Sequence, residues 1–181
     1  DHGHVNYNES CIASAGRSIM LGRTLLGERI WDVQRLVDFL RSRDDVDIHR
    51  IACMGQSSGG TVTLFASALE PRIAVSVVSG TLCTWAHSLY GVYHCPCNFV
   101  PNLARLADCG DIAGLAAPRP QLFVAAEHDH FFPVEGVYPA YDTVRRVYHS
   151  LGADDRVELD IGPEGHRFYK RLVWPFLARW L

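Results

Sequence analysis

The stretch CMGQSSGGTVTLFASALEPRIAVSVVSG, residues 53–80, places a Gly-x-Ser-x-Gly turn between a short apolar segment and a segment of helical composition. The apolar residues 51–54 predict a buried strand that ends at this turn, and residues 59–70 predict the helix that follows it. Glycines stand two positions before and two positions after Ser57, where a tight strand-to-helix turn leaves no room for side chains. The stretch therefore predicts a nucleophile elbow with an exposed serine.

Two serines compete for the exposed position. Ser57 has Gly55 and Gly59 at the flanking positions, whereas Ser58 has Gln56 at one of them, and that side chain would crowd the turn. We therefore predict Ser57 as the nucleophile, and the backbone N–H of Ser58 as a donor to developing negative charge. A glycine-rich phosphate cradle is the alternative, but the turn lacks the Gly-Lys-Ser/Thr of a P-loop.

Further apolar segments alternate with helical ones along the chain. Strands are predicted at 72–80, 122–126 and 156–161, and helices at 27–43, 137–153 and 166–181, the last interrupted near Pro175. Strands that are apolar on both faces and alternate with helices are typical of a parallel sheet covered by helices. We expect one α/β domain over residues 1–181, with a mostly parallel sheet flanked by helices and its functional groups at the carboxyl ends of the strands.

A serine hydroxyl needs a base and an orienting acid, which follow it in the order acid, then histidine, in this architecture. Asp129, just past the third predicted strand, is the predicted acid, and Glu127, still leaving that strand, is the second choice. His166, after a Gly-Pro-Glu-Gly turn at the end of the fourth strand, is the predicted base. His128 and His130 adjoin the predicted acid and cannot easily be oriented by it.

Composition excludes several classes of function. The chain has 181 residues, of which 48 % are hydrophobic and 20 % charged, as in an ordinary globular domain. Its net charge of −3, without a basic stripe, gives no indication of nucleic-acid or membrane binding. Residues 1–10 lack the regions of a signal peptide, and the chain begins with Asp, so we expect a processed or truncated chain whose compartment is left open.

The chain has six cysteines: Cys11, Cys53, Cys83, Cys95, Cys97 and Cys109. Cys53 lies in an apolar strand and is predicted to be a core residue. The segment HCPCN around Cys95 and Cys97, with His87 upstream and Cys109 downstream, lacks the ligand spacing of a structural zinc site. We therefore predict no metal and no cofactor, and expect a disulfide or free thiols.

Several segments together form a wider pattern: WDVQRLVDFL, CMGQSSGG, HCPCNFVPNL, IAGLAAPRPQLFVAAEHDHFFPVEG, GPEGHRFY and VWPFL. From about Leu21 onward the chain resembles the α/β-hydrolase superfamily, and within it the acetyl xylan esterase and dienelactone-hydrolase-like group. The resemblance implies Ser57 as nucleophile, Asp129 as acid and His166 as base. It also implies hydrolysis of an acyl ester through an acyl-enzyme, without a cofactor.

One departure from this group concerns the start of the chain. The group has several strands before the elbow and takes its second oxyanion donor from a His-Gly loop there, but little strand pattern precedes Ile51. Residues 1–7, DHGHVNY, offer a His-Gly pair, which we interpret as the tail of a loop after a missing strand. We expect either the C-terminal part of a longer domain or a compact variant whose sheet a second copy completes.

Residues 81–110 form a long connector rich in aromatic residues, which is predicted to be a lid or pocket wall, or the core of a small helical excursion. Candidate substrate contacts are Gln56, Trp85, Tyr90, Tyr93 and Phe99. The predicted function is a serine ester hydrolase that deacetylates carbohydrates or other small esters. The alternatives are a prolyl-oligopeptidase-like serine peptidase and a catalytically silent scaffold.

Overall fold

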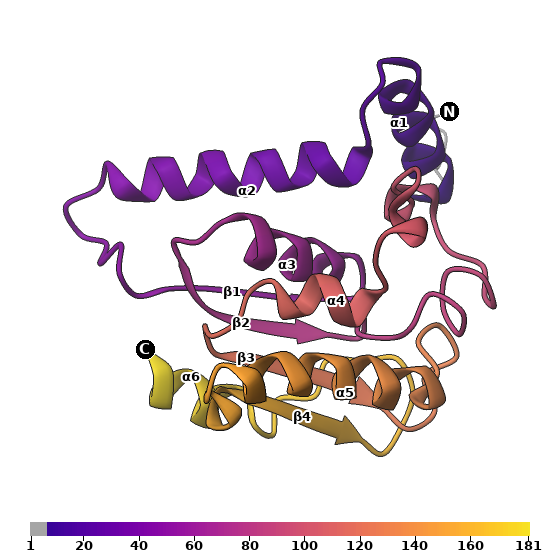
Figure 1. Ribbon diagram of the computed structural model, residues 1–181. Helices are drawn as coiled ribbons and strands as arrows, with labels where there is room; N and C mark the ends of the chain where they lie inside the picture. The colour runs from indigo at the N-terminus through magenta and orange to yellow at the C-terminus, as the bar shows by residue number, and fades with distance from the viewer. Residues whose placement is uncertain (1–6) are drawn as a thin grey trace.

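The computed structural model describes residues 7–181 and contains one sheet of four parallel strands (Figure 1). Their order in the sheet is their order in the chain: β1 Ile51–Gln56, β2 Ile73–Ser79, β3 Gln121–Ala126 and β4 Val157–Gly162. All four strands lie where the apolar segments predicted them. The predicted α/β fold with a parallel sheet is confirmed.

Helices and short 3-10 helices connect the strands. The helices are α1 Tyr7–Met20, α2 Leu25–Arg41, α3 Ser58–Leu69, α4 Cys109–Gly114, α5 Val134–Ser150 and α6 Val173–Trp180. The 3-10 helices are η1 Pro96–Asn98, η2 Leu103–Arg105 and η3 Asp154–Arg156. Among residues 7–181, none of the helices combines the length and the apolar character that crossing a bilayer demands.

Two hydrophobic clusters lie on opposite faces of the sheet, because successive side chains of a strand point to opposite sides. On one face, Val78 and Phe123 pack with buried side chains of α3, α4 and α5, and α2 lies outside α3 (Figure 1). On the other face, Val77 and Leu122 pack against Val173 and Phe176 of α6. The sheet is thus covered on both faces, as its uniformly apolar strands predicted.

β1, the strand that leads into the elbow, lies at the edge of the sheet in the described part of the chain. Its Met54 is 48 % exposed, whereas nearly all residues of β2 and β3 are buried. Between Tyr7 and Arg50 the described chain contains helices and turns but no strand. The sequence showed little strand pattern before Ile51, and the structure of residues 7–50 agrees with this.

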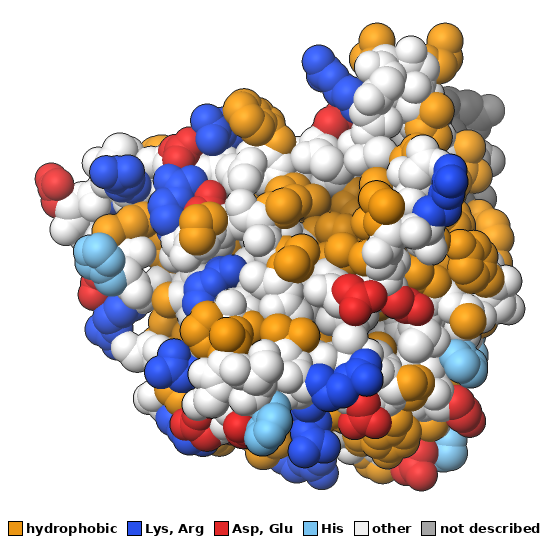
Figure 2. Space-filling model, in the orientation of Figure 1, with side chains coloured by type: hydrophobic (Ala, Val, Ile, Leu, Met, Phe, Trp, Pro, Cys, Tyr) orange, Lys and Arg blue, Asp and Glu red, His pale blue; other side chains and the backbone are white. Residues whose placement is uncertain are grey.

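Apolar surface is also exposed on the α2 side of the molecule. Trp31, Leu36 and Phe39 of α2 are each more than half exposed. Figure 2 shows hydrophobic side chains lining a hollow on this face, below the junction of α1 and α2. Within residues 7–181, the outer helical layer therefore leaves a contiguous apolar area uncovered. Such an area differs from the scattered single apolar residues that are common on protein surfaces.

The two ends of the chain differ from the sequence predictions. The closing helix begins at Val173, not at His166, and residues 163–172 form bends and turns. Pro175 does not interrupt this helix but lies in its first turn, where its missing N–H breaks no hydrogen bond. α1 was not predicted, because three Ser, one Asn and one Gly among its 14 residues have low helix propensity. A loop was predicted for residues 1–7. Residues 1–6 of it lie outside the described residues, and Tyr7 is the first residue of α1.

Candidate active site

Ser57 lies between the end of β1 and the start of α3, with φ 58° and ψ −120°. A non-glycine residue in such a conformation is strained by about 1–3 kcal/mol and persists only where its surroundings hold it. Its N–H donates to the carbonyl of Ser79 at 2.9 Å, and its own carbonyl accepts from the N–H of Thr61 at 2.8 Å and from Oγ1 of Thr81 at 2.9 Å. These bonds fix Ser57 at the tip of the elbow.

The glycines around Ser57 differ in what they contribute. A Cβ at Gly55 would lie 2.3 Å from the backbone of Gly59, and a Cβ at Gly60 would lie 2.4 Å from the carbonyl oxygen of Ser79. A Cβ at Gly59 would meet no atom within 4 Å. The tight turn therefore requires glycine at 55 and 60, and the expectation that Gly59 is needed for space is not met.

Asp129 and His166 come together beyond the carboxyl ends of β3 and β4. Nδ1 of His166 lies 2.7 Å from Oδ2 of Asp129, and Oδ1 of Asp129 accepts from the N–H groups of Phe131 at 2.9 Å and Phe132 at 3.2 Å. Asp129 is 5 % exposed. Burial would raise the pKa of Asp129, but the hydrogen bonds from His166 and the two N–H groups outweigh it, so the pKa is lowered. This carboxylate keeps the proton of His166 on Nδ1 and leaves Nε2 to accept another.

Gln56 connects the histidine to the elbow. Its amide Nε2 lies 3.5 Å from Nε2 of His166, and its Oε1 accepts a hydrogen bond from the hydroxyl of Ser79. Among the described residues, the elbow side chain that contacts Nε2 of His166 is that of Gln56 and not that of Ser57. Gln56 directly precedes Ser57, so the structure brings the imidazole to the elbow itself. Catalytic hydrogen bonds are often long or unmade before substrate binds.

The imidazole of His166 is held between aromatic rings, one of which leads to a further histidine. Phe132 stacks on it with ring centroids 5.8 Å apart, and Phe131 meets it edge-on at 5.2 Å. His94 lies behind them, 5.0 Å from the ring of Phe132, with Nε2 3.2 Å from the carbonyl oxygen of Phe131. Burial lowers the pKa of His94. Sequence reasoning missed this neighbour, although the segment HCPCN contains it.

The competing candidates lie elsewhere. Glu127, His128 and His130 are exposed, and within residues 7–181 none of them hydrogen-bonds to His166. Ser58 begins α3, so its backbone N–H belongs to the first turn, whose donors lack partners within the helix. The His-Gly pair predicted near the start of the chain lies outside the described residues.

The predicted substrate residues are distributed around the connector between β2 and β3. Trp85, Tyr90 and Phe99 line a cavity of about 250 Å³. Trp85 also packs against the core and donates from its indole N–H to the carbonyl of Ala107 at 2.8 Å, so the connector is both pocket wall and core. Tyr93 is 68 % exposed and does not line this cavity.

A narrower space adjoins this cavity. It has a volume of about 20 Å³ and shares Trp85, Leu89 and Asn98 with the larger cavity. It reaches Thr81, which hydrogen-bonds to Ser57, and Phe132, which stacks on His166. Ser57 and His166 themselves line neither space, so it is the narrower space that contacts their neighbours.

Comparison with known protein families and curated proteins gives three matches. Residues 20–88 match the family model of acetyl xylan esterase (AXE1). The chain is 31 % identical over 176 residues to the putative hydrolase YtaP of Bacillus subtilis, covering 90 % of this chain and 56 % of that protein. It is 27 % identical over 168 residues to 4-O-methyl-glucuronoyl methylesterase 1 of Wolfiporia cocos, covering 77 % and 41 %. The chain thus spans about half the length of these curated relatives.

Solved structures share the fold. A putative acetyl xylan esterase from Bacteroides fragilis matches with a TM-score of 0.77 at 16 % identity, covering 93 % of this chain and 52 % of that one. Methylesterase BT1017 matches with a TM-score of 0.70 at 27 % identity, covering 87 % and 36 %. The expected resemblance to the acetyl xylan esterase group, and the fold it implied, are confirmed.

Proposed function

We propose that this chain, an α/β-hydrolase whose residues 20–88 match the acetyl xylan esterase family, is a serine hydrolase of carbohydrate or other small esters. The observation that carries the proposal is the buried Asp129 carboxylate, 2.7 Å from a histidine whose other nitrogen faces the elbow of a strained serine. A serine, an imidazole and a carboxylate in this order are the three members of a catalytic triad: nucleophile, general base and orienting acid. The proposed roles are Ser57 as nucleophile, His166 as base and Asp129 as orienting acid.

The proposed reaction has two steps. The hydroxyl oxygen of Ser57 attacks the ester carbonyl while Nε2 of His166 takes its proton, and the imidazolium then protonates the leaving alcohol. Asp129 stabilises the imidazolium, and the N–H of Ser58 donates to the oxygen that becomes negative. Water, which gives its proton to Nε2 of His166, then attacks the acyl-enzyme; the bond from the acyl carbon to Oγ of Ser57 breaks, the acid leaves, and the imidazolium returns the proton to Oγ. To begin, Nε2 of His166 exchanges its contact with Gln56 for the neighbouring Ser57 hydroxyl.

The proposed substrate class follows from the cavity and from the names of the relatives. Trp85 and Tyr90 offer aromatic rings to a sugar or a small acyl group in a space of about 250 Å³. Acetyl xylan and glucuronoyl methyl esters, which appear in the relatives' names, place the ester on a carbohydrate. We infer that the chain acts on an ester of a sugar, with Gln56 positioned to contact it beside the elbow.

A panel of substrates tests this function. We expect hydrolysis of p-nitrophenyl acetate and of acetylated xylo-oligosaccharides or methyl glucuronate esters, with a higher kcat/KM on the sugar esters. A higher kcat/KM on aminoacyl-p-nitroanilides would instead support the prolyl-oligopeptidase-like peptidase. If the folded chain hydrolyses none of these and Ser57 does not react with a fluorophosphonate probe, the catalytically silent scaffold is supported.

We expect Gly80→Ala to impair both the fold and the reaction. Gly80 has φ +55°, and a Cβ there would lie 2.9 Å from Cε1 of His166 and 2.9 Å from Nε2 of Gln56. The strained backbone should cost about 1–2 kcal/mol in unfolding free energy. The displaced imidazole should lower kcat by about 10²-fold, which is the effect of a misplacement of about 1 Å. Urea unfolding and initial rates measure the two effects.

Gly152→Ala is the matched control for this substitution. Gly152 also has a positive φ, +64°, but a Cβ there would meet no atom within 4 Å. This variant should lose similar stability and keep its kcat. If Gly80→Ala had the same kcat as Gly152→Ala, the imidazole would not depend on the space above Gly80.

A further inference from the structure

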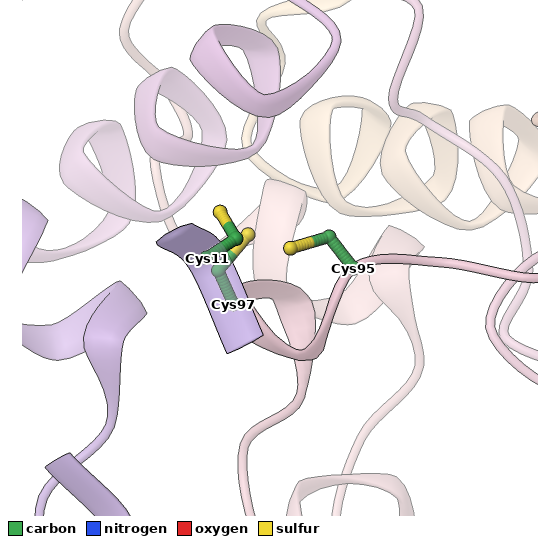
Figure 3. A group of neighbouring side chains, drawn as sticks. All are labelled: Cys11, Cys95 and Cys97. Atoms are coloured by element: carbon green, nitrogen blue, oxygen red, sulfur yellow. The ribbon is translucent and has the colours of Figure 1, made fainter. Parts of the chain in front are cut away.

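Three cysteine thiols from two distant parts of the sequence converge on one side of the molecule. Cys11 comes from α1, and Cys95 and Cys97 flank Pro96 at the start of η1, with their side chains directed toward one another (Figure 3). The three sulfur atoms all lie within 4.8 Å of one another. Cys97 is buried and the other two are partly buried. The proposed ester hydrolysis makes no use of this cluster.

We propose that Cys11, Cys95 and Cys97 bind one divalent thiophilic metal ion, with Zn²⁺ as the best fit. Zn–S bonds of about 2.3 Å in a tetrahedral site place the sulfurs about 3.8 Å apart, so thiols already within 4.8 Å need only small movements. Thiolate ligands select zinc and other soft ions over magnesium or calcium. Three protein ligands leave the fourth position to water or to another ligand.

The charge around the cluster favours a divalent ion. Nη2 of Arg29, in α2, lies 3.5 Å from the sulfur of Cys11. Three thiolates carry three negative charges, which a divalent ion and the guanidinium together neutralise. A monovalent ion such as Cu(I) would leave one negative charge in a partly buried place, where uncompensated charge is costly.

The surroundings shift the pKa values of the Cys11 and Cys95 thiols in opposite directions. Hydrogen bonds from Cys95, and then from Cys97 and Arg29, lower the pKa of Cys11 despite its burial. Burial raises the pKa of Cys95 to about 12, although the backbone N–H of Cys97 hydrogen-bonds to its sulfur and opposes this rise. Metal binding must therefore displace protons, and the apparent affinity should increase with pH.

A disulfide is the competing outcome for these thiols. It would join two of the sulfurs and leave the third thiol in the cluster without a bonding partner there. A metal ion binds all three sulfurs at once. It therefore explains why all three lie close together, whereas a disulfide explains the proximity of only two. The Cys-x-Cys spacing did not suggest a metal because the remaining ligand, Cys11, lies on a helix far away in the sequence.

The proposed ion attaches α1 to the connector beside the candidate active site. Within residues 10–20 of α1, only the small side chains of Ala15 and Ser18 are buried, whereas Ile12, Ile19 and Met20 are 48–88 % exposed. Hydrophobic packing therefore holds α1 weakly, and a metal adds an attachment at Cys11. Because His94 precedes Cys95 and contacts Phe131, the ion also fixes the segment behind the imidazole of His166.

Metal titration of the reduced chain, stripped with a chelator, tests the proposal. We expect one Co²⁺ per chain, with thiolate-to-cobalt charge-transfer absorption and the intense visible bands of tetrahedral cobalt, and displacement of Co²⁺ by Zn²⁺. At about 100 times its Kd, Zn²⁺ should raise Tm by about 5–10 °C. Binding should release protons, measured with a pH indicator in weak buffer.

Cysteine variants distinguish the cluster from other thiols. Cys11→Ser and Cys95→Ser should each weaken metal binding by more than about 100-fold, more than the loss of a residue that only hydrogen-bonds to a ligand usually does. Cys53→Ser on β1, outside the cluster, should bind like the unmodified chain. Circular dichroism confirms that each variant is folded. Absence of stoichiometric binding to the reduced chain, binding retained in Cys11→Ser, or a disulfide from Cys11 to Cys95 or Cys97 in a chain that takes up no metal once reduced would overturn the proposal.

Discussion

Ser57→Ala is expected to lower kcat for p-nitrophenyl acetate hydrolysis by about 10⁴-fold or more, because the members of a serine–histidine–carboxylate triad act as a unit. In the proposed mechanism, the acyl-enzyme bond forms on the hydroxyl oxygen of Ser57, and no other side chain can replace it there. The stability of the protein should change little or increase slightly, since a strained backbone with φ 58° remains in either case. Initial rates and fluorophosphonate labelling, read by mass spectrometry, measure the effect.

Ser58→Ala distinguishes the two serines of the elbow. Ser58 is exposed at the start of α3, and only its backbone N–H has a proposed role. The substitution preserves that N–H, so kcat should fall by less than about tenfold, far less than the loss of an oxyanion donor costs. A collapse of activity in Ser58→Ala, with Ser57→Ala still active, would exchange the two assignments.

Asp129→Asn is expected to lower kcat by about 10⁴-fold with KM nearly unchanged, as the loss of the orienting carboxylate does in triads. The structure indicates how. Oδ1 of Asp129 accepts from the N–H groups of Phe131 and Phe132, so the amide oxygen of Asn would take that position. Its NH₂ group would then face Nδ1 of His166 and donate to it. The imidazole proton would move to Nε2, which could no longer accept the proton of Ser57.

Glu127→Gln is the matched control, because Glu127 is exposed and was the other candidate acid. It should keep kcat within about twofold, as substitutions on the surface away from special features usually change little. Equal losses in the two variants would assign the acid role to neither residue alone.

The pH dependence of stability provides a second measurement on Asp129. Its pKa is lowered in the folded protein, so its ionised form stabilises the fold above its unfolded pKa of about 3.9. This contribution is lost as pH falls through the lower folded pKa. The difference in unfolding free energy between the unmodified chain and Asp129→Asn should therefore shrink on acidification below about pH 4.

Much of the fold and of the candidate triad follows from short segments of the chain. The elbow is recognisable because a strand, a turn that excludes side chains and a helix occupy consecutive residues, with Gly55 required in the turn. β1, β2 and β3 are recognisable as largely apolar runs, whereas β4 alternates Val157, Leu159 and Ile161 with two carboxylates. Asp129 and His166 could be selected because residues that follow parallel strands meet at one edge of the sheet.

Other features depend on contacts between segments that the local pattern does not pair. The need for glycine at 60 rather than 59 arises from the carbonyl of Ser79 on the neighbouring strand. His94 reaches the back of the imidazole site through a long connector, whose path no periodicity predicts. Gln56 contacts His166 only because β1 and the loop after β4 end at the same rim.

The cysteine cluster separates the two kinds of information most clearly. Apolar periodicity and turn chemistry depend on residues close in the chain, and they were sufficient to predict the strands and the elbow. The position of Cys11 beside Cys95 and Cys97 depends on how α1 packs against η1. That packing is a balance of many weak contacts between distant segments, and no spacing in the sequence encodes it.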